Sequence, residues 1–304
     1  MKTLFIDCND QLAPVWRQAL RAGDPPIDVN RAAFTPDDLP RLLDGYEICV
    51  DDHSYLPTAL AARCAALKHV VFLGTGAGSY MNVGELAERG IRVHTIKGYG
   101  DTAVAEHTIA LMMAACRDVA RMDREVRSGG WVTREGLQLT GKTLGIIGLG
   151  GIGREVARIG SGLGMKVIAW NRTPRPGESL VELDELLARA DVISLHLVLS
   201  DQTKGLLGPA QIARIKPGAV LINTARGALV DEAALIEALR CGRIRHAGLD
   251  VYHREPLAPD HPFTAMDNVT LTAHAGFRTL EASMTLLRRA IDIVNDIVAG
   301  GDPS

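Results

Sequence analysis

Short apolar runs, many of them rich in Val and Ile, alternate along the chain with longer stretches whose apolar residues recur at helical spacing. This alternation is typical of repeated βα units built around parallel sheets. Two series of such units follow one another and are separated near residue 98. The pattern therefore predicts an α/β chain with two doubly wound parallel-sheet lobes, of Rossmann or flavodoxin type, and a cleft between them.

The same periodicity gives the expected elements. In the first series, strands are predicted over 3–7, 47–51 and 69–73. In the second series, strands are predicted over 143–147, 166–170, 191–196, 219–223, a short run ending at 249, and 269–272. Helical spacing predicts helices over 57–67, 102–117 and 280–299.

A glycine-rich stretch, "GIIGLGGIG" at 145–153, lies between a predicted strand and a predicted helix. Glycines at this spacing make the tight turn, let a pyrophosphate approach the backbone, and allow close packing of helix on strand. The phosphates then meet free N–H groups at the start of the helix. We expect this loop to bind a dinucleotide through Gly148, Gly150, Gly151, Ile152 and Gly153.

The residues after the next strand bear on which dinucleotide is bound. An acidic residue usually lies about 20 residues beyond the glycines and binds the ribose hydroxyls of NAD. Here the place holds Asn171 and Arg172. Asn171 would not repel a 2′-phosphate, and Arg172 could contact one in bidentate fashion, with Thr173 and Arg175 nearby as donors. We expect NADP(H) to be favoured, with NAD(H) possible; the alternative is that Arg172 is a solvated loop residue.

Three later segments deliver a charged or titratable residue to the end of an apolar strand, where ligands bind on open parallel sheets. They are "AVLINTARGALVD", "HAGLDVYHREPL" and "NVTLTAHAGF", and they carry Arg226, Glu255 and His274. A hydride that arrives at a carbonyl carbon leaves negative charge on oxygen, which requires a proton donor and a fixed cation together. The three residues are therefore candidates for such a catalytic set.

At these segments the sequence resembles the D-specific 2-hydroxy acid dehydrogenases. The resemblance covers nearly the whole chain and rests on "GTGAG" (74–78), "AVAEHTIALMMAACRD" (103–118), "GKTLGIIGLGGIG" (141–153), "NTARGALVDEAAL" (223–235), "GLDVY" (248–252) and "TAHAG" (272–276). It implies that Arg226 holds and polarises a 2-oxo acid, that His274 exchanges a proton with the substrate oxygen, and that Glu255 pairs with His274.

The resemblance also implies the binding residues. Asp250 is expected to contact the nicotinamide carboxamide, although a strand-end hydrogen bond is an alternative. Thr224 and Ala225 are further cofactor-binding candidates. The backbone N–H groups of Gly76, Ala77 and Gly78 are expected to bind the substrate carboxylate, as an anion-binding nest.

The same resemblance implies the domain boundaries and the oligomeric state. We expect a catalytic domain made of residues 1–98 and 279–304, and a dinucleotide-binding domain over 99–278. Relatives form dimers through the cofactor domain, so a homodimer is expected, with "DVARMDREVRSGGW" at 118–131 as a candidate contact.

Composition narrows the remaining possibilities. The net charge of −3 gives no electrostatic reason to expect nucleic acid or an anionic membrane as a partner. The five cysteines are widely spaced without a CxxC pair, which favours reduced thiols over disulfides or a metal site. The N-terminus has no signal-peptide pattern, and no apolar run is long enough to span a membrane. We expect a cytoplasmic protein without a metal.

The leading hypothesis is thus an NADP(H)-preferring reductase of a small 2-oxo acid such as glyoxylate or hydroxypyruvate. One alternative keeps the fold but oxidises formate or phosphite. Another is a dinucleotide-sensing corepressor, which turnover of any 2-oxo acid would exclude.

Overall fold

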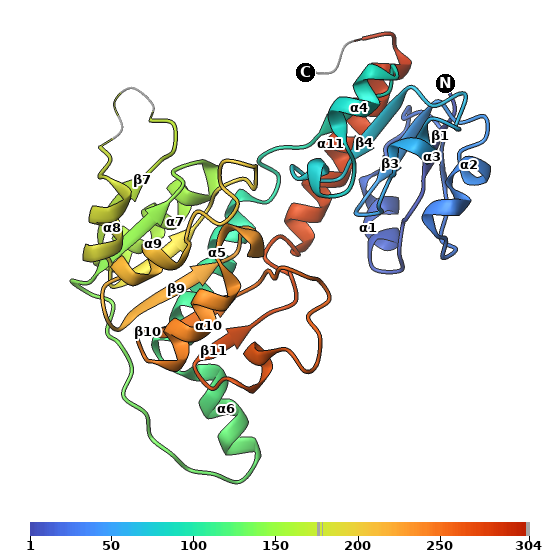
Figure 1. Cartoon of the computed structure of the whole chain (residues 1–304). Helices are drawn as coiled ribbons and strands as arrows, with labels where there is room; N and C mark the ends of the chain where they lie inside the picture. Colours follow the sequence, from blue (N-terminus) through green and yellow to red (C-terminus); the bar gives the residue numbers. More distant parts are fainter. Residues whose placement is uncertain (175–176, 178, 302–304) are drawn as a thin grey trace. The chain divides into compact units, whose positions relative to one another are not determined.

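The computed structural model describes residues 1–174, 177 and 179–301, and the chain divides into two compact units (Figure 1). Unit 1 comprises Met1–Gly100 together with Arg278–Ser304, and unit 2 comprises Asp101–Phe277. The chain therefore passes from unit 1 into unit 2 after Gly100 and returns after Phe277. Each unit contains one parallel sheet, which confirms the predicted α/β class with two doubly wound domains.

The sheet of unit 1 has the order β2-β1-β3-β4-β5. Its strands are β1 (Thr3–Phe5), β2 (Ile27–Val29), β3 (Ile48–Asp51), β4 (His69–Phe72) and β5 (Arg92–Thr95). The chain winds outward to β2 and then returns past β1 to β3, so the topological switch point lies between β1 and β3.

Helices cover both faces of this sheet. They are α1 (Leu12–Ala19), α2 (Leu39–Leu42), α3 (Thr58–Ala61), α4 (Val83–Glu88) and α11 (Leu280–Val298), with short 3-10 helices at Pro36–Asp38 and Ala77–Ser79. Because side chains alternate along a strand, Ile48 and Val50 pack with α1 and α11, whereas Cys49 packs on the opposite face with α2 and α3. Three of the four residues of β3 thus contribute to two separate hydrophobic layers.

Three details of unit 1 differ from the expected elements. Only the first part of the helix predicted over 57–67 is confirmed, as α3. After α3, the N–H groups of Arg63 and Cys64 bond to carbonyls three residues earlier, so the chain forms tight turns there in place of an α-helix. The edge strands β2 and β5 were not expected. Their residues are largely exposed or only partly buried, so they lack the apolar run on which strand prediction depends.

The sheet of unit 2 has the order β11-β10-β9-β8-β6-β7. Its strands are β6 (Thr143–Ile147), β7 (Lys166–Trp170), β8 (Val192–Leu195), β9 (Ala219–Asn223), β10 (Ile244–Leu249) and β11 (Val269–Leu271), all close to the predicted residues. The winding reverses between β6 and β8. The two sheets therefore share one order, except that unit 2 has the additional strand β11.

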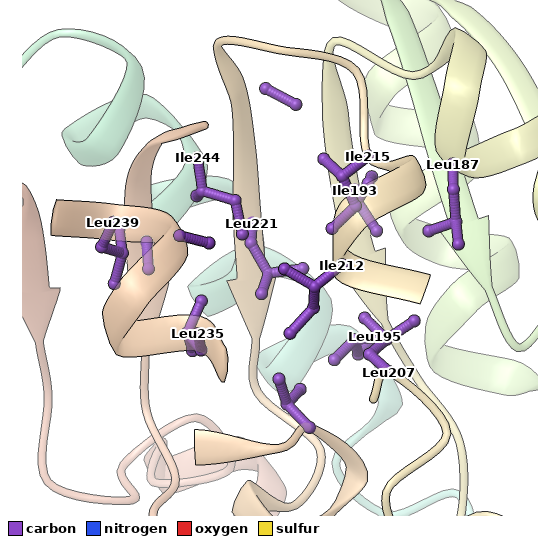
Figure 2. Packing of buried hydrophobic residues seen from close by; sticks show 14 of the residues in the cluster. Leu187, Ile193, Leu195, Leu207, Ile212, Ile215, Leu221, Leu235, Leu239 and Ile244 are labelled. Carbon is purple, nitrogen blue, oxygen red and sulfur yellow. The ribbon is translucent and has the colours of Figure 1, made fainter. Parts of the chain in front are cut away.

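Two helical layers bury this second sheet. The helices are α5 (Asp101–Cys116), α6 (Val119–Arg127), α7 (Gly151–Gly162), α8 (Leu183–Arg189), α9 (Pro209–Arg214) and α10 (Glu232–Arg240), with 3-10 helices at Gly227–Leu229 and Pro262–Ala265. Figure 2 shows one layer, in which Ile212 of α9 and Leu235 of α10 pack with Leu221 of β9. On the other face Val220 and Ile222 pack with residues of α5. Among the described residues, no helix is long and apolar enough to cross a membrane.

Candidate active site

The glycine loop lies at the switch point of unit 2, directly after β6. Gly148 has a φ of +104°, and a Cβ there would lie 2.7 Å from the backbone oxygen of His196, which follows β8. A Cβ on Gly153 would lie 2.0 Å from the oxygen of Gly148. Both positions therefore require glycine, for the left-handed turn and for the close helix–strand approach.

The same loop fits the pyrophosphate of a nicotinamide dinucleotide. Helix α7 starts at Gly151, and its N-cap, Gly150, provides no side-chain hydrogen bond to the first turn. The first N–H groups of a helix have no partner within the helix, and the helix dipole favours an anion there. A Cβ on Gly150 would meet nothing within 4 Å, whereas a Cβ on Gly151 would lie 1.9 Å from a carboxylate oxygen of Asp101, so the turn is open on the Gly150 side.

Asn171 and Arg172 follow β7 on the neighbouring strand. The side-chain oxygen of Asn171 accepts a hydrogen bond from the N–H of Leu149 at 2.6 Å, so Asn171 supports the glycine loop itself. Arg172 is exposed, and its Nη1 donates to Oε1 of Gln202 at 2.6 Å. Thr173 is also exposed, while Arg175 lies outside the described residues.

Arg226 lies in a turn that Asn223, the last residue of β9, holds at both ends. The side chain of Asn223 accepts from the N–H of Ala225 at 3.0 Å and donates to the carbonyl of Arg226 at 3.0 Å. The hydroxyl of Thr224 is 2.8 Å from that of Thr108 on α5. Because the Thr108 hydroxyl already donates to the carbonyl of Val104, it must accept the hydrogen of Thr224.

Glu255 and His274 form a close pair. Nδ1 of His274 lies 2.7 Å from Oε2 of Glu255, and Oε1 of Glu255 accepts from the N–H of Tyr252 at 2.9 Å. An ionised carboxylate only accepts hydrogen bonds, so Nδ1 of His274 must carry the hydrogen. The pairing thus leaves Nε2 as the nitrogen through which a neutral His274 could take a proton.

Electrostatics favour the ionised form of Glu255. Burial acts to raise the pKa of this carboxyl, but the hydrogen bonds from His274 and Tyr252 and the charges of His274 and Arg226 lower it. The net effect is a pKa below the ordinary value for Glu. Arg226 therefore acts electrostatically on the Glu255–His274 pair, so all three expected catalytic residues lie together in unit 2.

Asp250 shapes the loop that carries His274. Its side chain is 1% exposed, and its oxygens accept hydrogen bonds from the hydroxyl of Thr272 (2.6 Å) and the N–H groups of Ala275 and Gly276 (2.9 Å each). Its backbone oxygen accepts from the N–H of His274 at 2.8 Å. These are hydrogen bonds of the strand-end kind, and the expected contact of Asp250 with the nicotinamide carboxamide stays a prediction.

A close backbone contact joins the Arg226 turn to the Glu255 loop. A Cβ on Gly227 would lie 2.2 Å from the carbonyl carbon of Tyr252 and 2.6 Å from the backbone nitrogen of His253. The hydroxyl of Tyr252 in turn donates to the carbonyls of Leu249 and Thr272, at 3.1 and 2.7 Å. Tyr252 thus lies between the loops that follow β9, β10 and β11, a role that no sequence signal indicated.

In unit 1, the "GTGAG" loop follows β4 and leads into a 3-10 helix at Ala77–Ser79. Carbonyls of this loop accept from Ser79 (to Gly76) and from Tyr80 and Met81 (to Ala77). Within the described residues, no hydrogen bond uses the N–H groups of Gly76, Ala77 and Gly78. A Cβ on Gly78 would meet nothing within 4 Å, so the loop is open at Gly78, while Ala77 is buried.

The switch point of unit 1 holds an acidic cluster that includes Asp7, which sequence reasoning did not single out. The carboxylate of Asp7 accepts from the N–H groups of Asp52 (2.8 Å) and His53 (3.1 Å), and Oδ1 of Asp52 lies 2.9 Å from Nδ1 of His53. Burial and then the charge of Asp7 raise the pKa of Asp51 well above its ordinary value. No group of His, Cys, Asp or Glu among the described residues is arranged to hold a metal ion.

Comparison with known proteins places this geometry in a family. The model of the D-isomer specific 2-hydroxyacid dehydrogenase NAD-binding domain matches residues 109–276. The chain belongs to this family. It is therefore an oxidoreductase of the D-2-hydroxyacid dehydrogenase type, with a domain that binds a nicotinamide dinucleotide.

Individual relatives support the assignment over most of the chain. Glycerate dehydrogenase of Methylorubrum extorquens is 35% identical over 88% of this chain and 88% of its own length. D-3-phosphoglycerate dehydrogenase of Archaeoglobus fulgidus is 38% identical over 87% of this chain, but the chain spans only about half (52%) of that relative. Further relatives, 32–42% identical, are named glyoxylate reductase or hydroxypyruvate reductase.

A solved structure has the same fold as this chain. The TT0316 protein of Thermus thermophilus is 33% identical and superimposes with a TM-score of 0.88, covering 100% of this chain and 98% of that one.

The contact at Gly227 yields a first prediction. Gly227→Ala should lower kcat/KM about 100-fold. The new methyl group would overlap the Tyr252–His253 backbone, so the Arg226 turn would have to move by about 1 Å. Affinity for the dinucleotide, measured by fluorescence titration, should fall less than kcat/KM, since Thr224 and Ala225 share the displaced turn but the glycine loop lies after another strand.

Gly162→Ala in α7 is the matched control, because a Cβ there would meet nothing within 4 Å. Wild-type kcat/KM in the Gly227→Ala variant would show that the two loops do not depend on this contact.

Proposed function

We propose that the protein transfers a hydride between NADP(H) and a small 2-oxo acid or D-2-hydroxy acid, such as glyoxylate or hydroxypyruvate, with His274 as the acid/base. The observation that carries the proposal is the 2.7 Å pair between Nδ1 of His274 and the Glu255 carboxylate. This pair defines which ring nitrogen exchanges the proton, and the charge of Arg226 acts on it.

The chemistry follows from where charge develops during reduction. A bound nicotinamide dinucleotide would supply the hydride that C2 of the 2-oxo acid accepts. His274 donates the proton from Nε2 to the carbonyl oxygen, and Glu255 stabilises the ring while it is charged. Arg226 binds and polarises the substrate through guanidinium hydrogens, of which one already holds the carbonyl of Ala225 at 2.7 Å. In oxidation, neutral His274 accepts the alcohol proton at the same nitrogen.

The substrate class is supported by the anion-binding loop and by the relatives. The N–H groups of Gly76, Ala77 and Gly78, which donate no hydrogen bond within the described residues, suit a carboxylate, which every 2-oxo acid carries. Oxidation of glycerate at C2, the reaction implied by the name of the Methylorubrum extorquens relative, gives hydroxypyruvate. Relatives named for glyoxylate and hydroxypyruvate reduction point to the same small acids.

The preference for NADP(H) rests on the residues after β7. Asn171 adds no negative charge beside the ribose, and its oxygen is engaged by Leu149 of the glycine loop. Arg172 is exposed, and Nη1 donates to both Gln202 and Ser200 within the described part of the chain, so the hydrogens on Nε and Nη2 are the ones that would reach a 2′-phosphate. Asp250, directly after the buried end of β10, is the residue that would contact the carboxamide of the nicotinamide. Thr224 and Ala225, on the turn after the neighbouring strand β9, are further cofactor-binding residues.

We also propose a homodimer formed through unit 2. Helix α6 and the segment after it project from the rest of this unit (Figure 1), and no residue of α6 is buried. Trp131 in that segment is 87% exposed. A highly exposed aromatic side chain and a helix without a buried residue suit contact with a second copy.

The catalytic assignment predicts that His274→Ala lowers kcat for glyoxylate and hydroxypyruvate by roughly 10²–10⁴-fold. Binding of the dinucleotide should persist, since His274 follows β11 and the glycine loop follows β6. Steady-state rates with both acids, together with titration of the cofactor, test this. Normal turnover in the variant would remove His274 from the mechanism, and turnover of formate or phosphite in place of either acid would overturn the substrate class.

The cofactor assignment predicts that Arg172→Ala lowers kcat/KM for NADPH by about 10- to 100-fold, the loss of one charged bidentate contact. Activity with NADH should be unchanged. Arg189→Ala is a control, because Arg189 is an exposed arginine of α8 that pairs with Glu185 within its own helix. Equal use of NADH and NADPH by the wild type and by the Arg172→Ala variant would contradict the preference.

For the assembly, light scattering should give twice the chain mass for the wild type. Trp131→Asp should shift the equilibrium to the monomer, because a charge in the centre of an apolar contact is desolvated without a partner. Tyr55→Asp, at a 60% exposed position of unit 1, should leave the mass unchanged. A monomeric wild type would refute the dimer.

A further inference from the structure

Helix α5 contributes two consecutive polar residues, His107 and Thr108, to the loops that carry the candidate catalytic residues. Nε2 of His107 lies 3.0 Å from the hydroxyl of Thr272 and 3.4 Å from Oδ1 of Asp250. The hydroxyl of Thr108 accepts from Thr224, two residues before Arg226. Helix α5 thus contacts both Thr272, two residues before His274, and Thr224, two residues before Arg226.

The direction of each hydrogen bond follows from the donors available. Thr272 has one hydroxyl hydrogen, and it goes to the Asp250 carboxylate at 2.6 Å, since a carboxylate cannot donate. The oxygen of Thr272 must therefore accept from His107, so Nε2 of His107 carries a hydrogen. The chain of bonds runs from His107 to Thr272 to Asp250 without a break.

Asp250 needs these donors because it is a buried charge. Burial acts to raise its pKa, but the hydrogen bonds from His107 and Thr272 and from the N–H groups of Ala275 and Gly276 outweigh this and lower it. The carboxylate is thereby kept as the acceptor for the N–H groups of Ala275 and Gly276, directly after His274.

The backbone is strained at His274. Its φ is +50°, a left-handed conformation that is unfavourable for a non-glycine residue. Such conformations persist where the surroundings over-determine them. Here the bonds to Asp250 from His274, Ala275 and Gly276 do so, and a Cβ on Gly276 would lie 3.6 Å from Cδ2 of His107.

We propose that His107 is a positioning residue: through Thr272 it fixes the Asp250 carboxylate, and that carboxylate holds His274 in the left-handed conformation from which its ring meets Glu255. His107 takes no part in proton transfer. The proposal rests on His274 being the acid/base of the proposed function.

The test compares His107→Leu, which removes the donor, with His107→Gln, whose side-chain amide can still donate to Thr272. His107→Leu should lower kcat about 10- to 100-fold, the usual cost of losing a residue that orients a catalytic group. KM for the 2-oxo acid and affinity for the dinucleotide should change little, and His107→Gln should recover most of the lost kcat. His261→Gln, in a capping histidine of unit 2 away from these loops, is the control.

A second readout does not depend on turnover. In protein labelled with ¹⁵N-histidine, the His274 resonances, assigned by their loss in His274→Ala, should move in His107→Leu and stay in place in His107→Gln. If His107→Leu does not fold, Thr272→Val interrupts the same chain of bonds and should give the same two effects.

The two hypotheses fail in different ways. If the wild type reduces 2-oxo acids, and His107→Leu and Thr272→Val leave both kcat and the His274 resonances unchanged, the positioning role is wrong. Equal losses in His107→Leu and His107→Gln, accompanied by lost cofactor binding, would also overturn it in favour of a purely structural role. If the resonances move as expected but no variant and no wild type turns over any 2-oxo acid, the positioning role stands and the proposed function fails.

Discussion

Parallel strands place all their carboxyl ends at one edge of a sheet, and this constraint organises both units of the protein. In unit 2 it brings together segments that are far apart in sequence, the glycine loop after β6, the Arg226 turn after β9 and the His274 loop after β11. In unit 1 the same rule brings Asp7, Asp52 and the "GTGAG" loop to one edge. The three candidate catalytic residues, Arg226, Glu255 and His274, each belong to a loop that leaves such an edge.

A second constraint is that polar groups buried at these edges must be satisfied. Asn223 uses both ends of its side-chain amide to close the Arg226 turn, and Tyr252 donates to two carbonyls from adjacent strand ends. The almost fully buried carboxylate of Asp250 accepts hydrogen bonds from the hydroxyl of Thr272 and the N–H of Gly276. His274, which lies between these two residues, has a left-handed conformation. The positions of the loops at the site are thus fixed by hydrogen bonds that the buried polar groups require.

The two units use similar topology for different chemistry. The switch point of unit 2 presents glycines and the start of a long helix, which suits a pyrophosphate. The switch point of unit 1 presents a carboxylate cluster, while its anion-binding donors lie one strand further along, after β4. Fold alone would therefore not separate a cofactor domain from a substrate domain, and the loop residues make the distinction.

The sequence by itself determined the α/β class, most strands of unit 2, the glycine loop and the three candidate catalytic residues, because buried parallel strands and glycine spacing leave strong local patterns. Edge strands β2 and β5 left none, since their side chains are largely exposed. Only the tertiary structure decided that Asn171 supports the glycine loop, that Gly227 packs on the Tyr252 backbone, and that His107 reaches Asp250 through Thr272. These contacts join residues from separate strands and from a helix more than 140 positions away, and no local periodicity records which distant donor a buried acceptor will find.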